Sequence, residues 1–349
     1  MNRAEFAAEM RKKYMENESL TEGQRFEVYS DLMHTCEKLI EHFGAHENIC
    51  ISVSGGSDSD CIVHLVCTYF PEFLYKCKFV FVNTGLEYDA TKRHLRDLEK
   101  RYGITIDRIR GQSVVTVVRK YGFPILSKFK ATQINRWQKG SEYSERIIFY
   151  DGVKSFNAMK FSKQQQELAV YLKDNNIAVS AACCDYSKKK PIYTYIHTYS
   201  IDLNVTGERQ AEGGQRAIAH KSCFEEKNNG VDKYMPLWWW SNETKQIFKE
   251  TEGIRYSDCY EVYGMKRTGC CGCPFNLNIA DDLQAMYEYE PRLFKACMAV
   301  FGQAYELTDR FNCRRKKCLP ESFQMTITGE IERERNDQIG DAEWEKQKG

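Results

Sequence analysis

Short apolar runs alternate with more polar segments along the first third of the chain. The runs at 48–53, 77–83 and 104–109 have the length and composition of buried strands. The segments between them, 58–69 and 89–102, are predicted to be helices, the second of them rich in charge. Strands that alternate with helices predict right-handed βαβ units and a parallel sheet.

The first 46 residues predict a polar helical arm with one apolar face. The residues at helical spacing that we expect to pack on the core are Phe26, Val28, Leu32, Cys36, Leu39 and Ile40. The region 113–175 is predicted to be mostly helix and loop.

Later in the chain, 200–206 predicts a further strand. Ser241-Asn242-Glu243 have the composition of a helix start, and the three tryptophans before them, at 238–240, are expected to pack on the core rather than to stack on bases. Beyond Phe275 the chain is predicted to be helical and then highly charged, with 330–349 frayed.

These elements predict an α/β fold with a doubly wound parallel sheet. We expect three parts: a helical arm at 1–46, an α/β domain at 47–275, and a helical, charged C-terminal extension at 276–349.

Composition says more about the expected compartment and partners of the protein than about its activity. The 349 residues include 50 basic and 49 acidic side chains, and this net charge of +1 gives no electrostatic support to a nucleic-acid or anionic-membrane partner. No stretch approaches the roughly 20 apolar residues of a membrane span, and residues 1–18 lack the apolar core of a signal peptide. We therefore expect a cytoplasmic protein, in which 15 cysteines indicate metal binding or catalysis.

The segment ISVSGGSDSDCIVHL predicts a phosphate-binding turn between a strand and a helix. Gly55 and Gly56 allow a tight turn and a close approach of the backbone to oxygen atoms. The helix N-terminus that follows offers free N–H groups and a partial positive charge. The candidate loop also contains Ser54, Ser57, Asp58 and Ser59. No Gly-Lys-Ser/Thr follows, so it is not a Walker loop.

This SGGSDS motif resembles the SGGxDS loop of the N-type ATP pyrophosphatase (PP-loop) superfamily. The segment VFVNTGLEYDAT resembles the superfamily strand that ends in Asp-Thr-Gly beside the bound adenosine. Thr84, Gly85, Glu87 and Thr91 fit that pattern, whereas Asn83 replaces the usual Asp, which weakens any role for a carboxylate there. The resemblance implies an adenine-nucleotide site at the carboxyl ends of the strands, where open parallel sheets place ligands.

Four cysteines form a pattern typical of metal ligands. Cys183 and Cys184 are adjacent, and Cys270 and Cys273 form a C-x-x-C pair. Four thiolates complete either a zinc site or a 4Fe–4S cluster. An adjacent pair is awkward for one tetrahedral ion, whereas a cluster offers separate irons to separate ligands. Five other cysteines are expected to act as small buried apolar residues: Cys36, Cys61, Cys67, Cys77 and Cys297.

A Cys-Cys pair followed after about 80 residues by C-x-x-C resembles the cluster-containing assimilatory sulfonucleotide reductases of the phosphoadenosine-phosphosulfate (PAPS) reductase family. CCDYSKKKP has Lys188 and Pro191 at the family positions, and YGMKRTGCCGCPF resembles the approach to the second pair. The resemblance implies that the four cysteines bind a 4Fe–4S cluster, with Cys259 and Cys271 as alternative ligands.

The segment NVTGERQAEGGQRA resembles the family's anion-binding loop, in which a strand leads to Gly-x-Arg-Arg and a further Arg-Ala. Gly207, Arg209 and Arg216 match, while Gln210 stands where the second Arg is usual. Arginine suits phosphate or sulfate because its planar fork makes bidentate bonds. The lost Arg suggests an anionic ligand other than PAPS itself.

The resemblance thus implies roles for the residues of each motif. Lys188, Arg209 and Arg216 would act in catalysis by holding the transferring anion. The nucleotide-binding residues would be Ser54, Gly55, Gly56, Ser57, Asp58, Ser59, Thr84, Gly85, Glu87, Gly207 and Arg267.

Two enzymatic hypotheses follow. In one, the protein reduces, or transfers sulfur from, a sulfonucleotide. In the other, it uses ATP to adenylate a substrate and release pyrophosphate, as sulfur-modifying enzymes of DNA phosphorothioation and tRNA thiolation do. The expected ligands are ATP or a sulfonucleotide, with Mg²⁺ as a candidate companion, and the expected partner is an electron or sulfur donor protein.

A third hypothesis is a non-catalytic nucleotide- or redox-sensing subunit. The family's reductases attack sulfur with a cysteine in a Glu-Cys-Gly-(Leu/Ile)-His segment near the C-terminus, and this chain has no such segment. Cys313 and Cys318 are the late cysteines. Their basic neighbours would lower a thiol pKa, but we expect a polar, solvated loop there.

Overall fold

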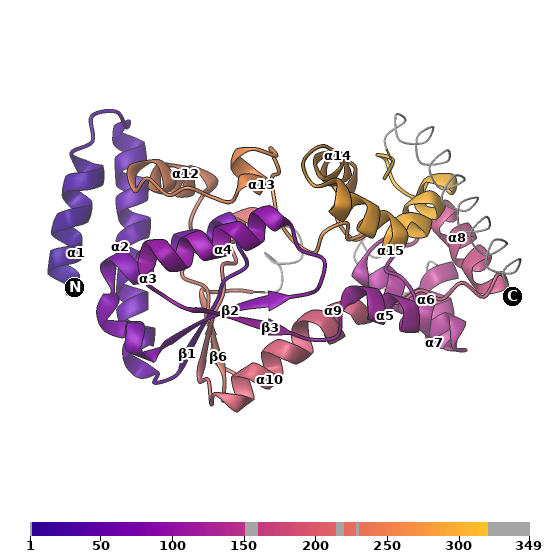
Figure 1. Cartoon of the computed structure of the whole chain (residues 1–349). Helices are drawn as coiled ribbons and strands as arrows, with labels where there is room; N and C mark the ends of the chain where they lie inside the picture. The colour runs from indigo at the N-terminus through magenta and orange to yellow at the C-terminus, as the bar shows by residue number, and fades with distance from the viewer. Residues whose placement is uncertain (1, 151–159, 214–219, 228–229, 320–349) are drawn as a thin grey trace, which may run out of the picture. The chain divides into compact units, whose positions relative to one another are not determined.

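The structure is a computed structural model, and it describes residues 2–150, 160–213, 220–227 and 230–319 (Figure 1). The chain divides into two compact units, each made of two chain segments. The first comprises Met1–Val117 and Cys183–Cys271, and the second comprises Val118–Ala182 and Gly272–Gly349. The three-part division expected from the sequence stays a prediction.

A six-stranded sheet with the order β3-β2-β1-β4-β6-β5 forms the centre of the first unit. Its strands are β1 (Ile49–Ser52), β2 (Cys77–Asn83), β3 (Ile106–Arg110), β4 (Leu203–Val205), β5 (Phe224–Glu225) and β6 (Asp232–Tyr234). The first five strands in that order pair parallel, and β5 pairs antiparallel with β6. The predicted parallel α/β sheet is confirmed.

The strand order reverses at β1, which pairs with β2 on one side and with β4 on the other. In an open parallel sheet, loops that leave the carboxyl ends of two such strands run to opposite sides and leave room for a ligand between them. The segments that follow β1 and β4 are therefore the two segments on which we expect a ligand site to depend.

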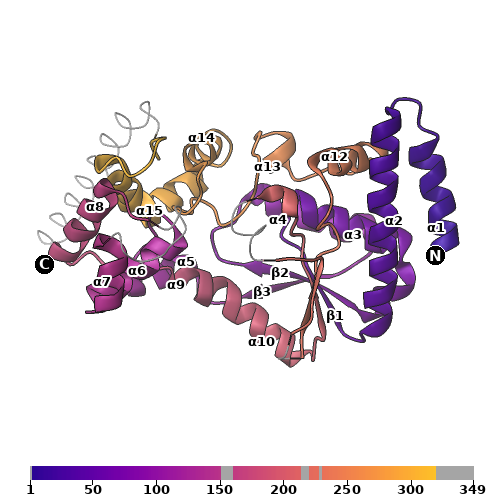
Figure 2. The same ribbon diagram turned by 180° about the vertical axis from the view of Figure 1, so that it is seen from behind.

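Helices cover both faces of the sheet, as the doubly wound prediction requires. Figures 1 and 2 show α3 (Ser57–Tyr69) and α4 (Asp89–Tyr102) on one side and α10 (Lys190–Thr198) on the other. Apolar side chains of α3, among them Leu65 and Val66, pack with Ile51 of β1 in the main core. Each such fully buried side chain contributes about 1.5–3 kcal/mol to folding.

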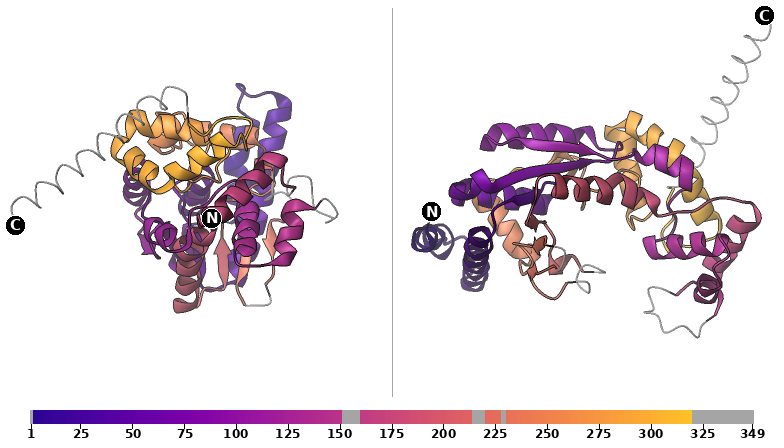
Figure 3. Two further views of the ribbon diagram at one scale, coloured as in Figure 1. Left: turned by 90° about the vertical axis from the view of Figure 1, so that its right-hand side faces the viewer. Right: turned by 90° about the horizontal axis from the view of Figure 1, so that it is seen from below.

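The N-terminal arm consists of α1 (Arg3–Met10), a π-helical turn η1 (Arg11–Met15) and α2 (Glu22–Ala45). Figure 3 shows α1 and α2 side by side, in indigo. Thr21 and Gln24 form a capping box at the start of α2. Val28 and Leu32 are buried as predicted, but Phe26 is 57% exposed. The prediction for Phe26 was wrong because two residues of a helix turn about 200°, so Phe26 faces away from Val28.

The remaining short elements of the first unit connect these helices and strands. They are η2 (Pro71–Lys76), η4 (Asp185–Lys189), η5 (Gln210–Glu212), α12 (Asn242–Thr251) and α13 (Asp258–Glu261). Of the three tryptophans before α12, Trp238 and Trp240 are buried and Trp239 is 46% exposed. Trp240 donates its indole N–H to Thr35 Oγ1 at 2.9 Å, which fixes α12 against α2 (Figure 2).

The second unit is helical in the part that is described. Its helices are α6 (Lys128–Gln138), α7 (Glu142–Phe149), α8 (Lys163–Asp174), α14 (Ile279–Tyr289) and α15 (Pro291–Arg310). Two boundaries between the units fall inside short helices, α5 (Val114–Tyr121) and α9 (Ala182–Cys184). The predictions of helix for 113–175 and beyond 275 are confirmed where residues are described. Across all the residues that the structure describes, no helix is both long and apolar enough to span a bilayer.

Candidate nucleotide site

The loop Ser54–Ser59 connects β1 to α3. It contains two glycines, and the geometry of the turn requires glycine at both positions. Gly55 has φ +67°, a left-handed conformation, and a Cβ there would lie 2.7 Å from Thr91 Cγ2. Gly56 is the N-cap of α3, and a Cβ there would lie 3.2 Å from Tyr260 Oη and 3.3 Å from Thr268 Oγ1. A larger residue at either position would strain the turn or displace its neighbours.

Hydroxyl groups of the loop hold its shape. The Gly56 N–H donates to Ser54 Oγ at 3.2 Å, and the Ser59 hydroxyl donates to the Gly56 carbonyl at 2.8 Å. Ser59 is buried, whereas Ser54 is exposed. The N-terminal N–H groups of α3 start at this loop, and such groups have no intrahelical partner. The loop therefore has the backbone donors and the dipole that an anion needs.

Two cations meet at Asp58, in the first turn of α3. Arg209 Nε donates to Asp58 Oδ1 at 2.7 Å, and Lys245 Nζ of α12 lies 3.0 Å from the same oxygen. Lys245 also donates to Ser57 Oγ at 2.9 Å. Lys245 thus brings a positive charge to the start of α3, beside the phosphate loop.

The guanidinium of Arg209 is bound by the protein on all of its nitrogens. Besides Asp58, it donates to the carbonyls of Trp240 and Ser241, each at 3.2 Å, and to Asn242 Oδ1 at 3.0 Å. Arg209 is only 3% exposed. In this structure it ties the phosphate loop to the start of α12, and its predicted contact with an anion stays a prediction.

Gly207 brings the segment after β4 against the first turn of α3. A Cβ at Gly207 would lie 3.0 Å from the Ser59 nitrogen and 3.1 Å from the carbonyl carbon of Asp58. The segments after β1 and β4 therefore lie in contact, as the reversal of strand order leads us to expect. Arg216 lies outside the described residues.

The turn after β2 is held by its own polar side chains. The Gly85 N–H donates to Asn83 Oδ1 at 2.9 Å, so the amide that replaces the expected Asp acts inside the turn. Glu87 Oε1 accepts from the Thr84 N–H at 3.0 Å and from its hydroxyl at 2.7 Å. Burial raises the pKa of Glu87, while these bonds and Lys188 oppose the rise.

A lysine and two thiols lie near Glu87. Burial lowers the pKa of Lys188, but Cys270, Glu87 and Cys184 outweigh that effect and raise it above the ordinary value. Burial raises the pKa of Cys270, and Lys188 opposes that rise. The Cys271 N–H donates to the Leu86 carbonyl at 3.3 Å, which joins the cysteine segment to the turn after β2. Part of the Lys188 side chain stays in contact with solvent, although these groups surround its ammonium.

The structure brings together part of the predicted cluster site. Cys184 and Cys270 interact through Lys188 and with each other. Cys183, the neighbour of Cys184 in the chain, is buried, and Cys273 belongs to the second unit, whose second chain segment begins at Gly272. Among the described residues there is no group of three or more His, Cys, Asp or Glu side chains arranged to hold a metal ion. The 4Fe–4S cluster expected on these four cysteines therefore stays a prediction.

Arg267 lies on an exposed segment next to the phosphate loop. Its neighbour Thr268 donates its N–H to the Tyr260 hydroxyl at 3.1 Å, and both Thr268 and Tyr260 approach Gly56. Arg267 itself is exposed. Its predicted contact with the nucleotide stays a prediction, and the position of its neighbour is consistent with it.

Cys313 and Cys318, in the second unit, are not in a solvated loop as expected. They are 7% and 1% exposed, and burial raises the pKa of each thiol to about 12. Asp309 accepts the N–H groups of Cys318 and Leu319 at 2.7 and 2.9 Å. These bonds fold the segment back onto the end of α15 and remove both thiols from water.

Sequence analysis missed three residues beside the phosphate loop: Lys245, Tyr260 and Thr268. Lys245 lies one turn into a helix whose start was predicted correctly, but a lysine on a polar helix carries no signal of its own. Tyr260 and Thr268 lie more than 200 positions from Gly56, and only the fold brings them to it.

Comparison with known proteins identifies the family of the chain. Residues 48–139 and 127–276 match the model of the phosphoadenosine phosphosulfate reductase domain. An uncharacterised protein of Methanocaldococcus jannaschii is 25% identical over 264 residues, which are 74% of this chain and 41% of the relative. The adenosine 5'-phosphosulfate reductase of Neisseria meningitidis is 23% identical over 159 residues, which are 44% of this chain and 62% of that enzyme. The chain thus spans about two fifths and three fifths of these relatives.

Solved structures give weaker similarity. A phosphoadenylyl-sulfate reductase of Candida auris, in complex with phosphate, aligns with a TM-score of 0.42 and 15% identity over 67% of this chain and 86% of that one. The FMN adenylyltransferase of Candida glabrata aligns with a TM-score of 0.45 and 12% identity over 77% and 70%. These scores are too low to carry an argument. The two family matches, by contrast, span more than half of the 349 residues, and the chain belongs to the phosphoadenosine phosphosulfate reductase domain family.

Proposed function

We propose that this chain binds an adenine nucleotide at the carboxyl end of β1 and acts in sulfonucleotide reduction or sulfur transfer. One observation carries the proposal: the strand order reverses between β1 and β4, and there the loop Ser54–Ser59 meets Gly207. Membership of the family supports a sulfonucleotide as the substrate class.

In this proposal the phosphates lie at the N-terminus of α3. The backbone N–H groups of Ser57–Ser59 and the Ser54 hydroxyl donate to phosphate oxygens. Lys245 offsets their negative charge, because its ammonium already lies at Ser57 and Asp58. Arg209 acts as a positioning residue that holds Asp58 and so the first turn of the helix.

Lys188 is the group that we propose for the anion being transferred. It is exposed, positively charged and next to Cys270. An ammonium there would hold a sulfate or phosphate oxygen and offset negative charge that develops during transfer.

A second candidate, ATP-dependent adenylation followed by sulfur transfer, is favoured by one observation. Gln210 stands where the family pattern has its second arginine. A cation that would bind the extra phosphate or the sulfate of PAPS is thus missing from this position, whereas the phosphate loop suits the phosphate chain of ATP.

The test is to titrate the purified protein with ATP and with PAPS by calorimetry while sulfite and pyrophosphate release are assayed. Lys245→Ala should weaken nucleotide binding about 10-fold or more, since a hydrogen bond to a charged group is worth about 1.5–3 kcal/mol. The matched control is Lys249→Ala, one turn further along α12, whose ammonium pairs with Glu261 at 2.8 Å.

Each reaction product in this assay identifies one of the candidate functions. Sulfite release supports the reductase, and pyrophosphate release supports adenylation. Nucleotide binding without either product would favour the non-catalytic sensing subunit. Failure of both nucleotides to bind, or equal losses in the two lysine variants, would contradict the proposed site.

A 4Fe–4S cluster held by Cys183, Cys184, Cys270 and Cys273 is a separate part of the proposal. It is supported by the interaction of Cys270 with both Cys184 and Lys188. A cluster there would change the electrostatic potential at the proposed anion site. Anaerobic purification should give a brown protein with iron and sulfide, and Cys270→Ser should bleach it while Cys67→Ser should not. A colourless protein that holds zinc would overturn this part alone.

A further inference from the structure

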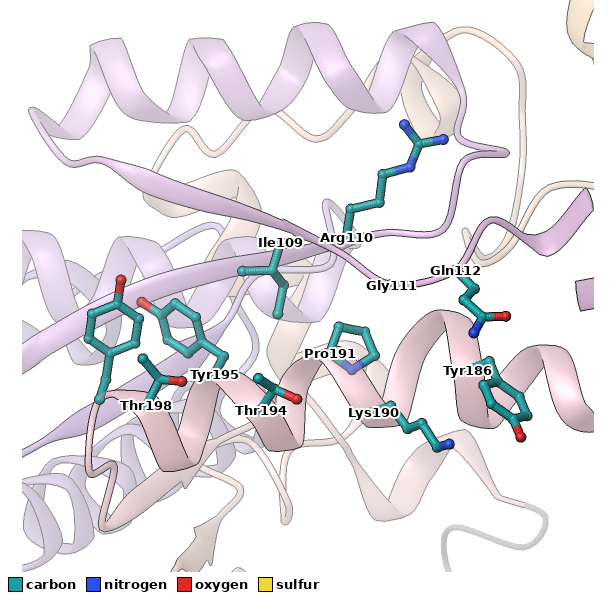
Figure 4. A pocket seen from close by; sticks show the side chains of 11 residues that line it. Ile109, Arg110, Gly111, Gln112, Tyr186, Lys190, Pro191, Thr194, Tyr195 and Thr198 are labelled. Atoms are coloured by element: carbon teal, nitrogen blue, oxygen red, sulfur yellow. The ribbon is translucent and has the colours of Figure 1, made fainter. Parts of the chain in front are cut away.

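Arg110 is a cation at the carboxyl edge of the sheet to which no role has been assigned. It is the last residue of β3 and pairs in register with Asn83, the last residue of β2. Figure 4 shows its side chain on the side of β3 away from α10. A Cβ at Gly85 would lie 3.4 Å from Arg110 Nη2, so the guanidinium lies against the turn that follows β2.

The positive charge of Arg110 is not neutralised by a carboxylate. Among the residues that the structure describes, Arg110 has no hydrogen bond or ion pair, and it is exposed. Arg108, two positions earlier on the same strand, donates to both carboxylate oxygens of Glu99, at 2.8 and 2.7 Å. The residue paired with Arg110 is Asn83, which carries no charge. The two arginines of β3 therefore differ: one is held by an acidic partner, and the other is available to a ligand.

A second cation borders the same turn. Lys188 of η4 interacts electrostatically with Glu87, the carboxylate of the turn. Gly111 keeps η4 close to the end of β3, because a Cβ at Gly111 would overlap the carbonyl oxygen of Tyr186. Arg110 and Lys188 thus approach one turn from two elements, and their combined charge exceeds that of Glu87. A local excess of positive charge attracts an anion even when the net charge of the chain is near zero.

The segment 268–271 connects this turn to the phosphate loop. Thr268 Oγ1 would lie 3.3 Å from a Cβ at Gly56, and the Cys271 N–H donates to the Leu86 carbonyl at 3.3 Å. The phosphate loop follows β1 and Arg110 ends β3, with β2 between them. Since neighbouring strands lie about 4.8 Å apart, the two positions are separated by on the order of 10 Å across the sheet. One nucleotide with two anionic groups can reach both.

We propose that Arg110 binds a second anionic group of the nucleotide, a phosphate or a sulfate, in addition to the group at the phosphate loop. A guanidinium suits either anion, because its planar fork makes two parallel hydrogen bonds to the oxygens. Gln210 leaves the segment after β4 without a second arginine, and β3 provides a cation instead. The inference rests on the proposed function, since it requires a nucleotide bound at Ser54–Ser59.

The test is calorimetric titration with PAPS, ATP and AMP, the last of which has a single phosphate. Arg110→Ala should weaken the binding of PAPS or ATP about 10- to 150-fold, the change expected for a lost hydrogen bond to a charged group. AMP should bind the variant as it binds the unaltered protein. Arg110→Lys should recover part of the loss, because an ammonium keeps the charge but not the bidentate geometry.

Two further ligands distinguish the sources of the second anion. Adenosine 3',5'-bisphosphate has the ribose phosphate of PAPS without the sulfate, and adenosine 5'-phosphosulfate has the sulfate without the ribose phosphate. A loss in Arg110→Ala for the first ligand alone assigns Arg110 to the ribose phosphate, and a loss for the second alone assigns it to the sulfate. Either result supports the proposal.

The matched control is Arg108→Ala, which removes the other arginine of β3. Its guanidinium is bound to Glu99, so this change should leave all the affinities unaltered. Melting temperatures of the variants check that each of them is folded.

Three results would overturn the inference: unchanged affinities for PAPS and ATP in Arg110→Ala, an equal loss for AMP, or an equal loss in Arg108→Ala. In each of these cases the unaltered protein still binds nucleotide, and the proposed function stands. If the unaltered protein bound none of the nucleotides, the proposed function and this inference would fail together.

Discussion

Asp58 links the backbone turn that receives an anion to the cations that surround it. Its carboxylate contacts Arg209 and Lys245, and the side chains of Asp58 and Arg209 are 13% and 4% exposed. A negative group in the first turn of a helix is also stabilised by the helix dipole. The residue was predicted as part of a binding loop, and that role stays a prediction, while its ion pairs with Arg209 and Lys245 also give it a structural role.

Asp58→Asn should destabilise the protein by about 3–5 kcal/mol, because it leaves the buried Arg209 charge without its partner. Urea unfolding followed by tryptophan fluorescence measures the change. Asp89→Asn, an exposed acid in the first turn of α4, is the control and should change stability by less than about 0.5 kcal/mol. Equal effects of the two changes would show that the Arg209 contact adds nothing to stability.

Cys313 and Cys318 should react slowly with iodoacetamide in the folded protein. With a pKa of about 12, each thiol has on the order of a thousandfold less thiolate at pH 8 than an ordinary cysteine, and each side chain is also buried. Mass spectrometry after timed labelling measures the rates, and the same cysteines labelled in urea provide the reference. Fast labelling in the folded state would restore them as candidates for a catalytic thiol.

At the scale of elements, the end of α12 anchors the N-terminal arm. Glu252, the C-cap of α12, has a side chain that is 3% exposed. Its carboxylate accepts hydrogen bonds from Lys13 and Tyr14 of η1 and from Tyr69 of α3, and His64 Nε2 lies 3.2 Å from it. One buried charge therefore joins three elements that are far apart in the sequence.

This cluster should make stability depend on pH in the acid range. Burial raises the pKa of Glu252, but the hydrogen bonds from its four neighbours outweigh that effect and lower it to about 2 from the ordinary 4.5. The folded state thus favours the charged form. Its contribution is complete above about pH 4.5 and is lost as the pH falls toward 2.

Glu252→Gln should therefore cost about 3 kcal/mol at neutral pH and flatten the fall in stability between pH 4.5 and 2. Urea midpoints measured across this range test both effects. Glu250→Gln, on the exposed side of the same helix, should leave the profile unchanged. A steep acid transition that persists in Glu252→Gln would assign the dependence to other groups.

At the scale of the whole molecule, each unit is assembled from two separate stretches of chain. The segment Cys183–Cys271 completes the sheet that Met1–Val117 begins, and it supplies β4, Gly207 and Arg209 to the phosphate loop. The proposed nucleotide site therefore exists only when both stretches of the first unit are folded together.

Nucleotide binding should consequently protect both stretches. At a concentration 100 times the dissociation constant, ATP or PAPS should add about 2.7 kcal/mol to stability and raise the melting temperature. Hydrogen exchange should slow at 54–59 and 206–213. Protection limited to 118–182 would indicate that the nucleotide binds elsewhere.

Local pattern was sufficient to predict many of the elements. The strand Cys77–Asn83 and the helix Asp89–Tyr102 have the predicted bounds, because apolar runs and flanking glycines act over a few residues. Phe26 was placed on the wrong face and Cys313 in the wrong solvent environment. For both residues, burial depends on which distant part of the chain packs against them, and local composition carries no information about that packing.

The sequence by itself determined the parallel α/β sheet, the phosphate loop after β1 and the family, because each depends on short motifs and on periodicity. Only the tertiary structure decided how those motifs are used. Arg209 was predicted from its motif as an anion ligand, and the motif does not reveal that its guanidinium binds Asp58 and the start of α12. Lys245 carries no local signature. Its position follows from long-range packing, since a contact between residues separated by 100 positions or more is set by the whole fold.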